Sequence, residues 1–325
     1  MKICLTGDRA PAMKEAAARL LEPEGKIPEI VVLDAEGRFD GEPAGSEVIY
    51  FSLGVTNHPA AMGALMSLLD EPALRWLQGP GAGIDHPIWK SLIDRGVRLT
   101  NASGIHSEPI AQYIFTYVLH WERNVERHRL QQVNREWEII RSGDLAEKTI
   151  GIIGYGGIGQ ATARVAKAFG MRVLGSRRTR FEDAALDRFV PIDSLDELFA
   201  ESHYVVLCMP FSDETRGMID HRALCAMRPD AVLINVARGG VVDEEALIRA
   251  LQAKAIRGAT LDVVSEEPLP PSSPLWTLEN CMLTPHDAGY SPLGDERLGA
   301  LFLENLGRYV RDEPLVNEVF STGFE

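Results

Sequence analysis

The stretch that decides the fold is TIGIIGYGGIGQATARVAKAFGMRVLGSRRT, residues 149–179. Its apolar opening, residues 149–153, predicts a buried parallel strand. Apolar residues at helical spacing follow as far as Phe169, and residues 171–175 then predict a second strand. Between the first strand and the helix lies the pattern Gly-x-Gly-x-x-Gly, formed by Gly154, Gly156 and Gly159. Strand, glycine turn, helix and strand in this order predict a dinucleotide-binding site.

Each glycine of this turn has its own predicted task. Gly154 permits the tight turn, Gly156 lets a pyrophosphate approach the backbone, and Gly159 lets helix and strand pack closely. Free N–H groups at the helix start, around Gly157 and Ile158, are predicted to hold the phosphates. The plain alternative is a glycine turn that binds nothing, but the flanking strands and helix favour the binding turn.

The end of the second strand indicates which dinucleotide is bound. An NAD site places an acidic residue there, about 20 residues on, where it accepts a hydrogen bond from the ribose. In this chain Ser176, Arg177 and Arg178 stand at that point, with Arg180 close behind. Guanidinium groups can bind the 2′-phosphate of NADP through two parallel hydrogen bonds. We therefore expect NADP(H), with NAD(H) as the alternative cofactor; the plain alternative is a solvated basic turn.

The composition of the whole chain bounds the kinds of partner that it can have. Its 325 residues suffice for two domains, and 45% hydrophobic with 25% charged residues are typical of a globular protein. A net charge of −14 argues against nucleic acid or an anionic membrane as a partner, because both need a basic surface. No apolar run approaches the roughly 18 residues of a membrane span. The four cysteines lack metal-site spacing, so we expect no metal and a cytoplasmic protein with reduced cysteines in its core.

Residues 1–100 alternate strand and helix patterns, which predicts a parallel sheet covered by helices. The predicted strands are 2–5, 30–33 and 48–51, and the predicted helices are 12–21 and 59–69. Ligands meet such sheets at the carboxyl ends of the strands, which points to the loops 52–56 and 79–83. Backbone N–H groups in these glycine-containing loops can approach a carboxylate. The predicted substrate residues are Leu53, Gly54, Gly81 and Ala82. For either loop alone, an ordinary strand-to-helix turn is an equal alternative.

The later part of the chain carries a long helical pattern and then a second set of strands. Residues 108–141 predict a helix, whose polar part from Arg123 onward is either an oligomer arm or a solvated helix. Beyond the two strands already described, the predicted strands are 189–192, 204–209, 231–236, 258–263 and 281–284, enough for a complete dinucleotide domain. A last helix, about residues 292–311, is expected to return to the first domain.

Three residues just past the carboxyl ends of later strands are candidates for the chemistry. Arg238, flanked by glycines, is placed to bind a substrate carboxylate, and Glu267 and His286 follow at the next two strand ends. Each alone has a plain alternative as a surface or loop residue, but together they predict an acid–base and anion-binding set. The other predicted cofactor contacts are Pro210, Thr215, Val236, Ala237, Asp262 and Gly289.

The chain resembles the D-isomer-specific 2-hydroxyacid dehydrogenases over essentially its whole length. The matching segments are GIIGYGGIGQATARVAKAFGMRV, INVARGGVVDEEALIRAL, GATLDVVSEEPLP and LTPHDAGY. The resemblance implies that Arg238 binds the substrate, that Glu267, 29 residues later, is the catalytic acid, and that His286 is the histidine of the family's T-P-H segment. The chain is most similar to the glyoxylate and hydroxypyruvate reductases, several of which have a basic strand end like residues 176–178.

The residues predict an α/β fold of two doubly wound parallel-sheet domains, and the resemblance implies their arrangement. A Rossmann dinucleotide domain, residues 101–289, is inserted in a flavodoxin-like substrate domain, residues 1–100 and 290–325. A homodimer through the inserted domain is usual in the family. Asp262 is expected close to the nicotinamide ring. Gln112 and Asp287 depart from the family pattern, and Asp287 either raises the pKa of the neighbouring histidine or faces solvent.

We expect an NAD(P)H-dependent reductase that converts a small 2-oxo acid, of the glyoxylate or hydroxypyruvate class, into its D-2-hydroxy acid. His286, kept protonated by Glu267, is the expected proton donor. Two alternatives stay open. A formate- or phosphonate-type dehydrogenase on the same scaffold would lack this set of three residues or add a different one. A non-enzymatic NAD(P)H-sensing protein shares the residues but usually carries extra docking segments, and none is recognisable here.

Overall fold

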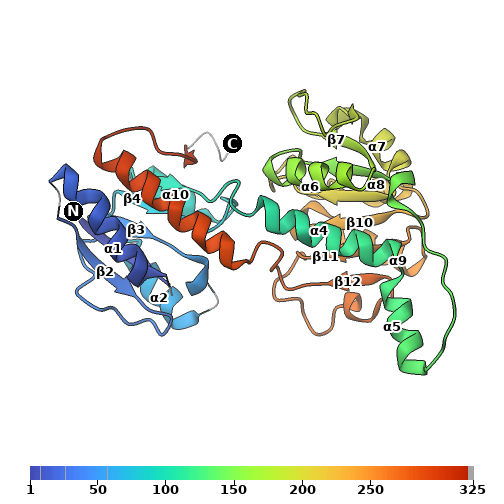
Figure 1. Cartoon of the computed structure of the whole chain (residues 1–325), viewed down its shortest axis with the longest axis horizontal. Helices are drawn as coiled ribbons and strands as arrows, with labels where there is room; N and C mark the ends of the chain where they lie inside the picture. The colour runs from blue at the N-terminus through green and yellow to red at the C-terminus, as the bar shows by residue number, and fades with distance from the viewer. Residues whose placement is uncertain (8, 26, 57, 321–325) are drawn as a thin grey trace. The chain divides into compact units, whose positions relative to one another are not determined.

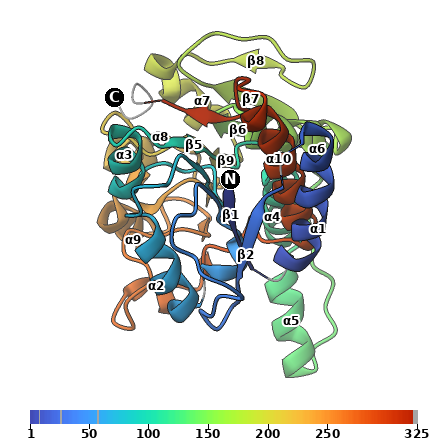
Figure 2. The same cartoon turned by 90° about the vertical axis from the view of Figure 1, so that its left-hand side faces the viewer.

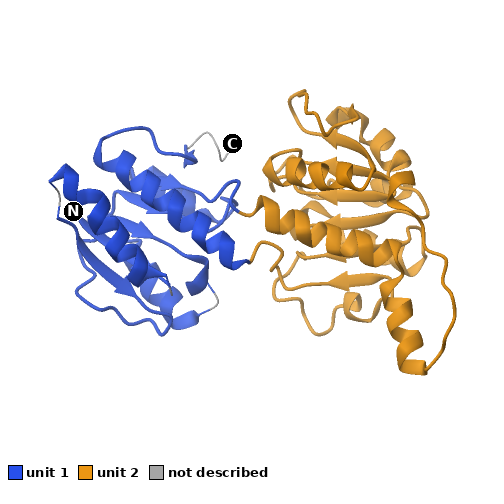
Figure 3. Cartoon of the chain, in the orientation of Figure 1, with its two compact units in different colours: residues 1–105, 291–325 blue, residues 106–290 orange. Residues whose placement is uncertain are grey.

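A computed structural model describes residues 1–7, 9–25, 27–56 and 58–320 (Figure 1). The chain divides into two compact units (Figure 3). Unit 1 comprises residues 1–105 and the segment from Ser291 onward, and unit 2 is the continuous segment His106–Tyr290. Each unit holds one sheet with helices on both faces, which confirms the predicted α/β class. Unit 2 is thus an insertion in the chain of unit 1.

Unit 1 is built on a six-stranded sheet in the order β13-β5-β4-β3-β1-β2. Neighbouring strands pair in parallel, except that β13 is antiparallel to β5. The strands are β1 (Lys2–Thr6), β2 (Glu29–Leu33), β3 (Val48–Tyr50), β4 (Trp76–Gln78), β5 (Arg98–Thr100) and β13 (Glu318–Val319). Apart from β13, this order is that of flavodoxin, so the predicted flavodoxin-like fold is confirmed.

The α-helices of unit 1 that the structure describes are α1 (Ala10–Leu21), α2 (Pro59–Leu68), α3 (Pro87–Asp94) and α10 (Pro292–Val310). Helices α1 and α10 lie side by side on one face of the sheet, and α2 and α3 pack on the other (Figure 2). Helix α10 buries Leu298, Phe302 and Leu306 against the sheet, where the Phe302 ring stacks on Trp76 with centroids 5.2 Å apart. The last helix therefore returns to the first part of the chain, as predicted.

Unit 2 holds a seven-stranded parallel sheet in the order β12-β11-β10-β9-β6-β7-β8. Its strands are β6 (Thr149–Ile153), β7 (Arg172–Ser176), β8 (Arg188–Phe189), β9 (Tyr204–Leu207), β10 (Val232–Asn235), β11 (Gly258–Leu261) and β12 (Cys281–Leu283). The strand order reverses between β6 and β9, which is the Rossmann arrangement. In such sheets ligands bind beyond the carboxyl ends of the strands at this reversal.

Helices cover both faces of the unit 2 sheet. One face packs against α4 (Ser107–Glu122) and α6 (Gly157–Ala168), and the other against α7 (Leu195–Glu201), α8 (His221–Ala226) and α9 (Glu244–Gln252). Every residue of β6, β9, β10 and β11 is buried. Burial on both faces explains why these strands could be recognised as continuous apolar runs and not as alternating ones.

The single helix predicted over residues 108–141 is wrong in its continuity and in its end. Helix α4 ends at Glu122, Asn124 adopts a left-handed conformation with φ 54°, and α5 runs only over Val125–Asn134. Arg135, also left-handed, ends α5, and the rest of the predicted helix has no regular structure. Asparagine adopts this conformation at little cost, so the helical pattern on either side does not reveal the break. Helix α5 stands away from the sheet of unit 2 (Figure 1).

Two smaller expectations also need correction. All four cysteines are free, but Cys225 is exposed on α8 and does not belong to a core. Strand β8 covers Arg188–Phe189 and not residues 189–192, because Pro191 has no N–H to continue the ladder. In the described part of the chain, no helix is both long and apolar enough to span a membrane.

Candidate active site

The glycine turn joins β6 to α6 at the strand reversal of unit 2. Gly154 has a positive φ of 94° and packs against the backbone of Met209, so a side chain there would clash. At Gly159, an added Cβ would lie 3.0 Å from the Gly154 oxygen and 3.1 Å from Ile152 Cγ2. At Gly156 an added Cβ would meet nothing within 4 Å. The turn is closed toward the sheet and open at Gly156, which fits a phosphate group at the helix N-terminus.

The start of α6 and the end of β7 extend this cradle. Gly157, the first residue of α6, is exposed, and Ile158 is partly exposed. The Ser176 hydroxyl at the end of β7 is buried and has no hydrogen-bond partner among the described residues. A buried hydroxyl without a partner is unfavourable. The residues present therefore fit a dinucleotide, whose polar groups would satisfy both the helix start and this hydroxyl.

The basic turn, residues 176–180, carries the guanidinium groups that distinguish this strand end. Arg177 stacks on the Phe181 ring, with its guanidinium carbon 4.3 Å from the ring centroid, and donates to the Thr179 oxygen at 2.9 Å. Arg178 is mostly exposed, and its side chain pairs with Glu214 at 3.5 Å. Two guanidinium groups thus follow Ser176 directly in the chain, and the structure gives each of them a partner on the protein itself.

The loop after β9 carries Pro210 and Thr215. The Thr215 hydroxyl donates to the Pro210 oxygen at 2.9 Å and accepts from the Ser212 N–H at 2.8 Å. Thr215 therefore closes the loop through its own hydroxyl. The loop begins beside the glycine turn, because Cys208 Sγ donates to the Gly154 oxygen at 3.1 Å.

Arg238 lies in the turn that follows β10. Asn235 shapes this turn, since its side chain accepts from the Ala237 N–H at 3.0 Å and donates to the Arg238 oxygen at 3.1 Å. Gly239 packs against the backbone of Val264 with no room for a Cβ, which brings the arginine turn against the segment after β11. Buried just before Arg238 are the predicted cofactor contacts Val236 and Ala237.

His286 and Glu267 form an acid–base pair. His286 Nδ1 lies 2.8 Å from Glu267 Oε2, and the Val264 N–H donates to the other carboxylate oxygen at 3.2 Å. The hydrogen bond to Glu267 raises the pKa of His286 against the opposing effect of burial. Burial alone would raise the pKa of Glu267, but the hydrogen bond and charge of His286 outweigh it and lower that pKa. Arg238 lowers both pKa values through its charge, so the structure brings all three predicted catalytic residues together.

Asp262 holds the loop that carries His286. Its carboxylate accepts from the Thr284 hydroxyl at 2.6 Å and from the N–H groups of Asp287 and Ala288 at 3.0 and 3.2 Å. The His286 N–H donates to the Asp262 carbonyl oxygen at 2.8 Å, and His286 adopts a left-handed conformation with φ 57°. The predicted cofactor contact is therefore also the anchor of the histidine loop.

The two departures from the family pattern, Gln112 and Asp287, both have exposed side chains. Burial raises the pKa of Tyr113 and Tyr117, and the charge of Asp287 adds to both rises. The main cause of the raised pKa of His286 is instead its hydrogen bond to Glu267. The structure therefore favours an Asp287 side chain that faces solvent over one that raises the pKa of His286.

Two residues of this region, Tyr113 and Thr284, are absent from the predicted set. The Tyr113 hydroxyl oxygen lies 2.6 Å from Thr284 Oγ1. Thr284 could have been found from its place just before Pro285 and His286, but Tyr113 stands 171 residues away in sequence and gives no local signal. His106 likewise approaches the predicted residue Gly289, with its Nδ1 3.2 Å from the Gly289 oxygen.

The predicted substrate loops share one edge of unit 1, because each follows a strand and these two strands, β3 and β4, pair in parallel. Residues Leu53–Val55 form a short 3₁₀ helix, in which Gly54 is exposed. In the second loop Gly81 is partly exposed, and the Asn101 side chain donates to the Ala82 oxygen at 3.0 Å. All four predicted substrate residues therefore lie at the carboxyl edge of the unit 1 sheet.

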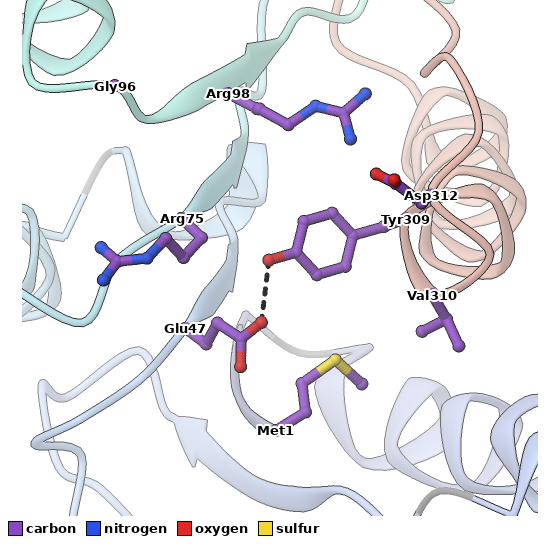
Figure 4. Close-up of a pocket in the computed structure, with 8 residues that line it drawn as sticks. All are labelled: Met1, Glu47, Arg75, Gly96, Arg98, Tyr309, Val310 and Asp312. Carbon is purple, nitrogen blue, oxygen red and sulfur yellow. Dashed lines mark hydrogen bonds between the residues drawn. The ribbon is translucent and has the colours of Figure 1, made fainter.

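Unit 1 also has a pocket of about 640 Å³ at the opposite, amino edge of its sheet (Figure 4). Its lining comes from residues before the strands and from the end of α10: Met1, Glu47, Arg75, Gly96, Arg98, Tyr309, Val310 and Asp312. The Tyr309 hydroxyl donates to Glu47 at 2.8 Å, and Arg98 pairs with Glu318 at 2.7 Å. Ligands of such sheets bind at the carboxyl ends of the strands. The pocket is therefore not our candidate site.

Comparison with known proteins places this geometry in a family. Residues 115–288 match the model of the NAD-binding domain of the D-isomer-specific 2-hydroxyacid dehydrogenases. A glyoxylate reductase of Korarchaeum cryptofilum is 36% identical over 77% of this chain and 80% of its own length. A glyoxylate reductase of Pyrococcus horikoshii is 33% identical over 92% of this chain and 97% of its own.

Solved structures agree over almost the whole chain. A D-isomer-specific 2-hydroxyacid dehydrogenase family protein from Aeromonas salmonicida superposes with a TM-score of 0.80 at 28% identity, covering 98% of this chain and 99% of that one. A D-isomer-specific 2-hydroxyacid dehydrogenase from Xanthobacter autotrophicus, in complex with NADPH and MES, gives a TM-score of 0.78 at 28% identity and covers 99% of each chain. The chain belongs to the D-isomer-specific 2-hydroxyacid dehydrogenase family.

Proposed function

We propose that the protein is an NADP(H)-preferring reductase of a small 2-oxo acid, of the glyoxylate or hydroxypyruvate class, which it converts into the D-2-hydroxy acid. The observation that carries this proposal is the His286–Glu267 pair at 2.8 Å, with Arg238 acting electrostatically on both. Glyoxylate reductases among the relatives support the substrate class.

The three residues divide the work at the substrate. Arg238 binds the carboxylate of the 2-oxo acid and polarises its carbonyl oxygen. Glu267 occupies Nδ1 of His286, so Nε2 is the nitrogen left to donate a proton to that oxygen. The raised pKa of His286 keeps the donor charged above neutral pH better than an ordinary histidine. The nicotinamide cofactor supplies the hydride when it is bound.

The open turn at Gly156, the start of α6 and the Ser176 hydroxyl would hold the cofactor, with Arg177 and Arg178 at its 2′-phosphate. The other predicted contacts lie on the strand ends of unit 2 described above. The Xanthobacter autotrophicus relative, whose complex contains NADPH, supports the preference for NADP(H) over NAD(H). Four free cysteines support a reducing, cytoplasmic location for such an enzyme.

We assign the cofactor to the inserted domain, residues 101–289, and the substrate loops to residues 1–100 with 290–325. A panel of 2-oxo acids, read as NADPH oxidation by the unmodified protein, tests the proposal. Glyoxylate or hydroxypyruvate should give the highest kcat/KM, and the product should be the D isomer where it is chiral. Tight NADPH binding without turnover of any acid would favour the non-enzymatic NAD(P)H-sensing protein instead.

We further propose a homodimer formed through the arm, defined as residues 123–144 of unit 2. Five apolar side chains on this arm are exposed: Val125 (45%), Leu130 (54%), Val133 (61%), Trp137 (100%) and Ile139 (94%). Apolar side chains gathered on one projecting segment are typical of a protein interface. The partner that we assign to them is a second copy of the chain. The residue directly before the arm is fixed within unit 2, because the Tyr204 hydroxyl donates to the buried Glu122 at 2.7 Å.

A double variant, Trp137→Ser with Ile139→Ser, should turn the dimer into a monomer, because it removes the two most exposed apolar side chains of the arm. Sedimentation or light scattering measures the mass. Trp276→Ser is the matched control, since Trp276 is an exposed (55%) tryptophan of unit 2 outside the arm. A double variant that stays dimeric would place the interface elsewhere.

A further inference from the structure

We propose that Thr284 and Tyr113 are positioning residues for the reaction, because they act through Asp262 to fix the loop that carries His286. The inference rests on the proposed function for its catalytic meaning, while its geometry rests on contacts within unit 2. These contacts form a chain that starts at Tyr113 on α4, passes Thr284 just after β12, and reaches Asp262 just after β11.

Chemistry fixes the direction of the hydrogen bonds along this chain. Each group described above that contacts the Asp262 side chain is a hydrogen-bond donor. This suits a carboxylate, which can only accept hydrogen bonds. The Thr284 hydroxyl therefore donates its single proton to Asp262 at 2.6 Å. The Tyr113 hydroxyl, 2.6 Å from Thr284 Oγ1, must then donate to that oxygen. Burial raises the pKa of Tyr113 well above its usual range, which keeps this donor protonated.

Asp262 passes the restraint to the histidine loop. Its carboxylate oxygens accept from the N–H groups of Asp287 and Ala288, the two residues directly after His286. His286 has a φ of 57°, a conformation that a non-glycine residue keeps only where its surroundings hold it. The same loop must keep Nδ1 of His286 2.8 Å from Glu267. A loop released from Asp262 would lose the geometry of proton donation.

Thr260 offers a matched control for a merely structural role. It lies on β11, two residues before Asp262, and its hydroxyl accepts from the Trp121 indole N–H at 3.0 Å. Like Thr284, it therefore joins the sheet of unit 2 to helix α4 through a hydroxyl. Thr260→Val breaks a partly buried hydrogen bond, as Thr284→Val does, but leaves the contacts of Asp262 and of the histidine loop intact.

The activity test compares five variants of the full chain, saturated with NADPH. Thr284→Val should lower kcat by about 10- to 100-fold through misplacement of the proton donor, and Tyr113→Phe by about 3- to 10-fold. The double variant should be about as slow as Thr284→Val alone, because Thr284→Val already interrupts the hydrogen bonds that link Tyr113 to Asp262. Thr284→Ser should restore most of kcat. The KM for the 2-oxo acid should change little, because Arg238 is untouched.

The control variant, Thr260→Val, shows whether Thr284→Val acts by misplacing His286 or only by making the protein less stable. Thr260→Val should lower the melting temperature but keep kcat within about twofold, because its lost hydrogen bond does not reach the histidine loop. The proposal is overturned if Thr260→Val slows the enzyme as much as Thr284→Val does. It is also overturned if Thr284→Ser fails to restore kcat, or if the effects of Thr284→Val and Tyr113→Phe multiply in the double variant.

Backbone amide exchange separates this proposal from the proposed function. In Thr284→Val the amides of His286, Asp287 and Ala288 should exchange at least about tenfold faster, because local opening becomes easier. In Thr260→Val they should exchange at the normal rate. Unchanged exchange in Thr284→Val overturns the positioning role even if turnover falls. An unmodified protein that reduces no 2-oxo acid overturns the proposed function, and the exchange rates still decide whether Thr284 holds the loop.

Discussion

Two polar regions of unit 2 are built in opposite ways. In the acid–base corner, formed by Arg238, residues 262–267 and residues 284–289, the chain's own groups hold one another at 2.6–3.2 Å. In the basic turn, residues 176–180, the Arg178 side chain is 65% exposed and its ion pair is long, at 3.5 Å. The Ser176 hydroxyl, in the same turn, is buried without a partner among the described residues.

The difference teaches which groups must be in place before a ligand arrives. Proton donation depends on orientation, so the groups of the corner are fixed by the chain itself. Discrimination between two cofactors depends on charge, which the guanidinium groups of an exposed turn can supply. Substitutions in the corner should therefore change turnover, and substitutions in the basic turn should change cofactor affinity.

The largest effect is expected from removing His286, the proposed proton donor. His286→Ala should lower kcat by about 10²- to 10⁴-fold, the usual contribution of a positioned general acid. Cofactor affinity, measured by NADPH fluorescence titration, should stay nearly normal, because the cradle at Gly156 is untouched. A His286→Ala enzyme with near-normal turnover would pass the role to another group, and Asp287 or His106 would be the next to test.

A smaller loss is expected at the substrate arginine. Arg238→Lys keeps the charge but loses the two-pronged geometry, which should cost roughly 2 kcal/mol of transition-state binding, or about 30-fold in kcat/KM. KM should rise and kcat should fall together, because the same group binds the carboxylate in both states. Arg228→Lys, at a surface arginine that pairs with Asp230, is the control. An unchanged KM for glyoxylate would move the anchor to the loops of unit 1.

The basic turn should respond in affinity and not in turnover. Arg177→Asp should shift preference from NADPH toward NADH by about 1–3 kcal/mol, the size of one charge-assisted hydrogen bond. The ratio of kcat/KM for the two cofactors measures this shift. Arg222→Asp makes the same charge change at an exposed arginine of α8 and should leave the ratio unchanged. An unmodified enzyme that uses both cofactors equally would contradict the assigned role of the turn.

The most subtle effect is a change in pH dependence. In the proposed mechanism, reduction needs protonated His286, so activity should persist as the pH rises and fall once the pH passes the raised pKa of His286. Glu267→Gln removes the negative charge, so the falling limb of the kcat profile should move to lower pH. His286 and Glu267 titrate as a coupled pair, so the falling limb of the profile reports an apparent pKa of the pair and not that of one residue. Glu266→Gln, the exposed neighbour, should not move the limb; if Glu267→Gln does not move it either, another group holds the proton.

Local patterns predicted much of unit 2, because its strands are buried on both faces and its turn needs glycine. Arg238, Glu267 and His286 could be grouped because the carboxyl ends of adjacent parallel strands share one edge. The pairing of Tyr113 with Thr284 could not be predicted, since it depends on how α4 crosses the sheet. The left-handed break at Asn124 also leaves no mark in the pattern of apolar residues. Strand β13, which pairs antiparallel to β5, is only two residues long, which is too short a segment for a strand pattern to be recognised in its sequence.

A ribosome releases one part of unit 1 before unit 2 and the other part after it. Residues 1–105 emerge first, but they lack α10, whose Leu298, Phe302 and Leu306 complete their core, and β13, which covers the edge of β5. Unit 2 is continuous and has all of its residues once Tyr290 has emerged. Unit 1, whose two parts flank unit 2, can therefore close only after unit 2 has been synthesised, and until then its apolar face is a surface for chaperones to shield.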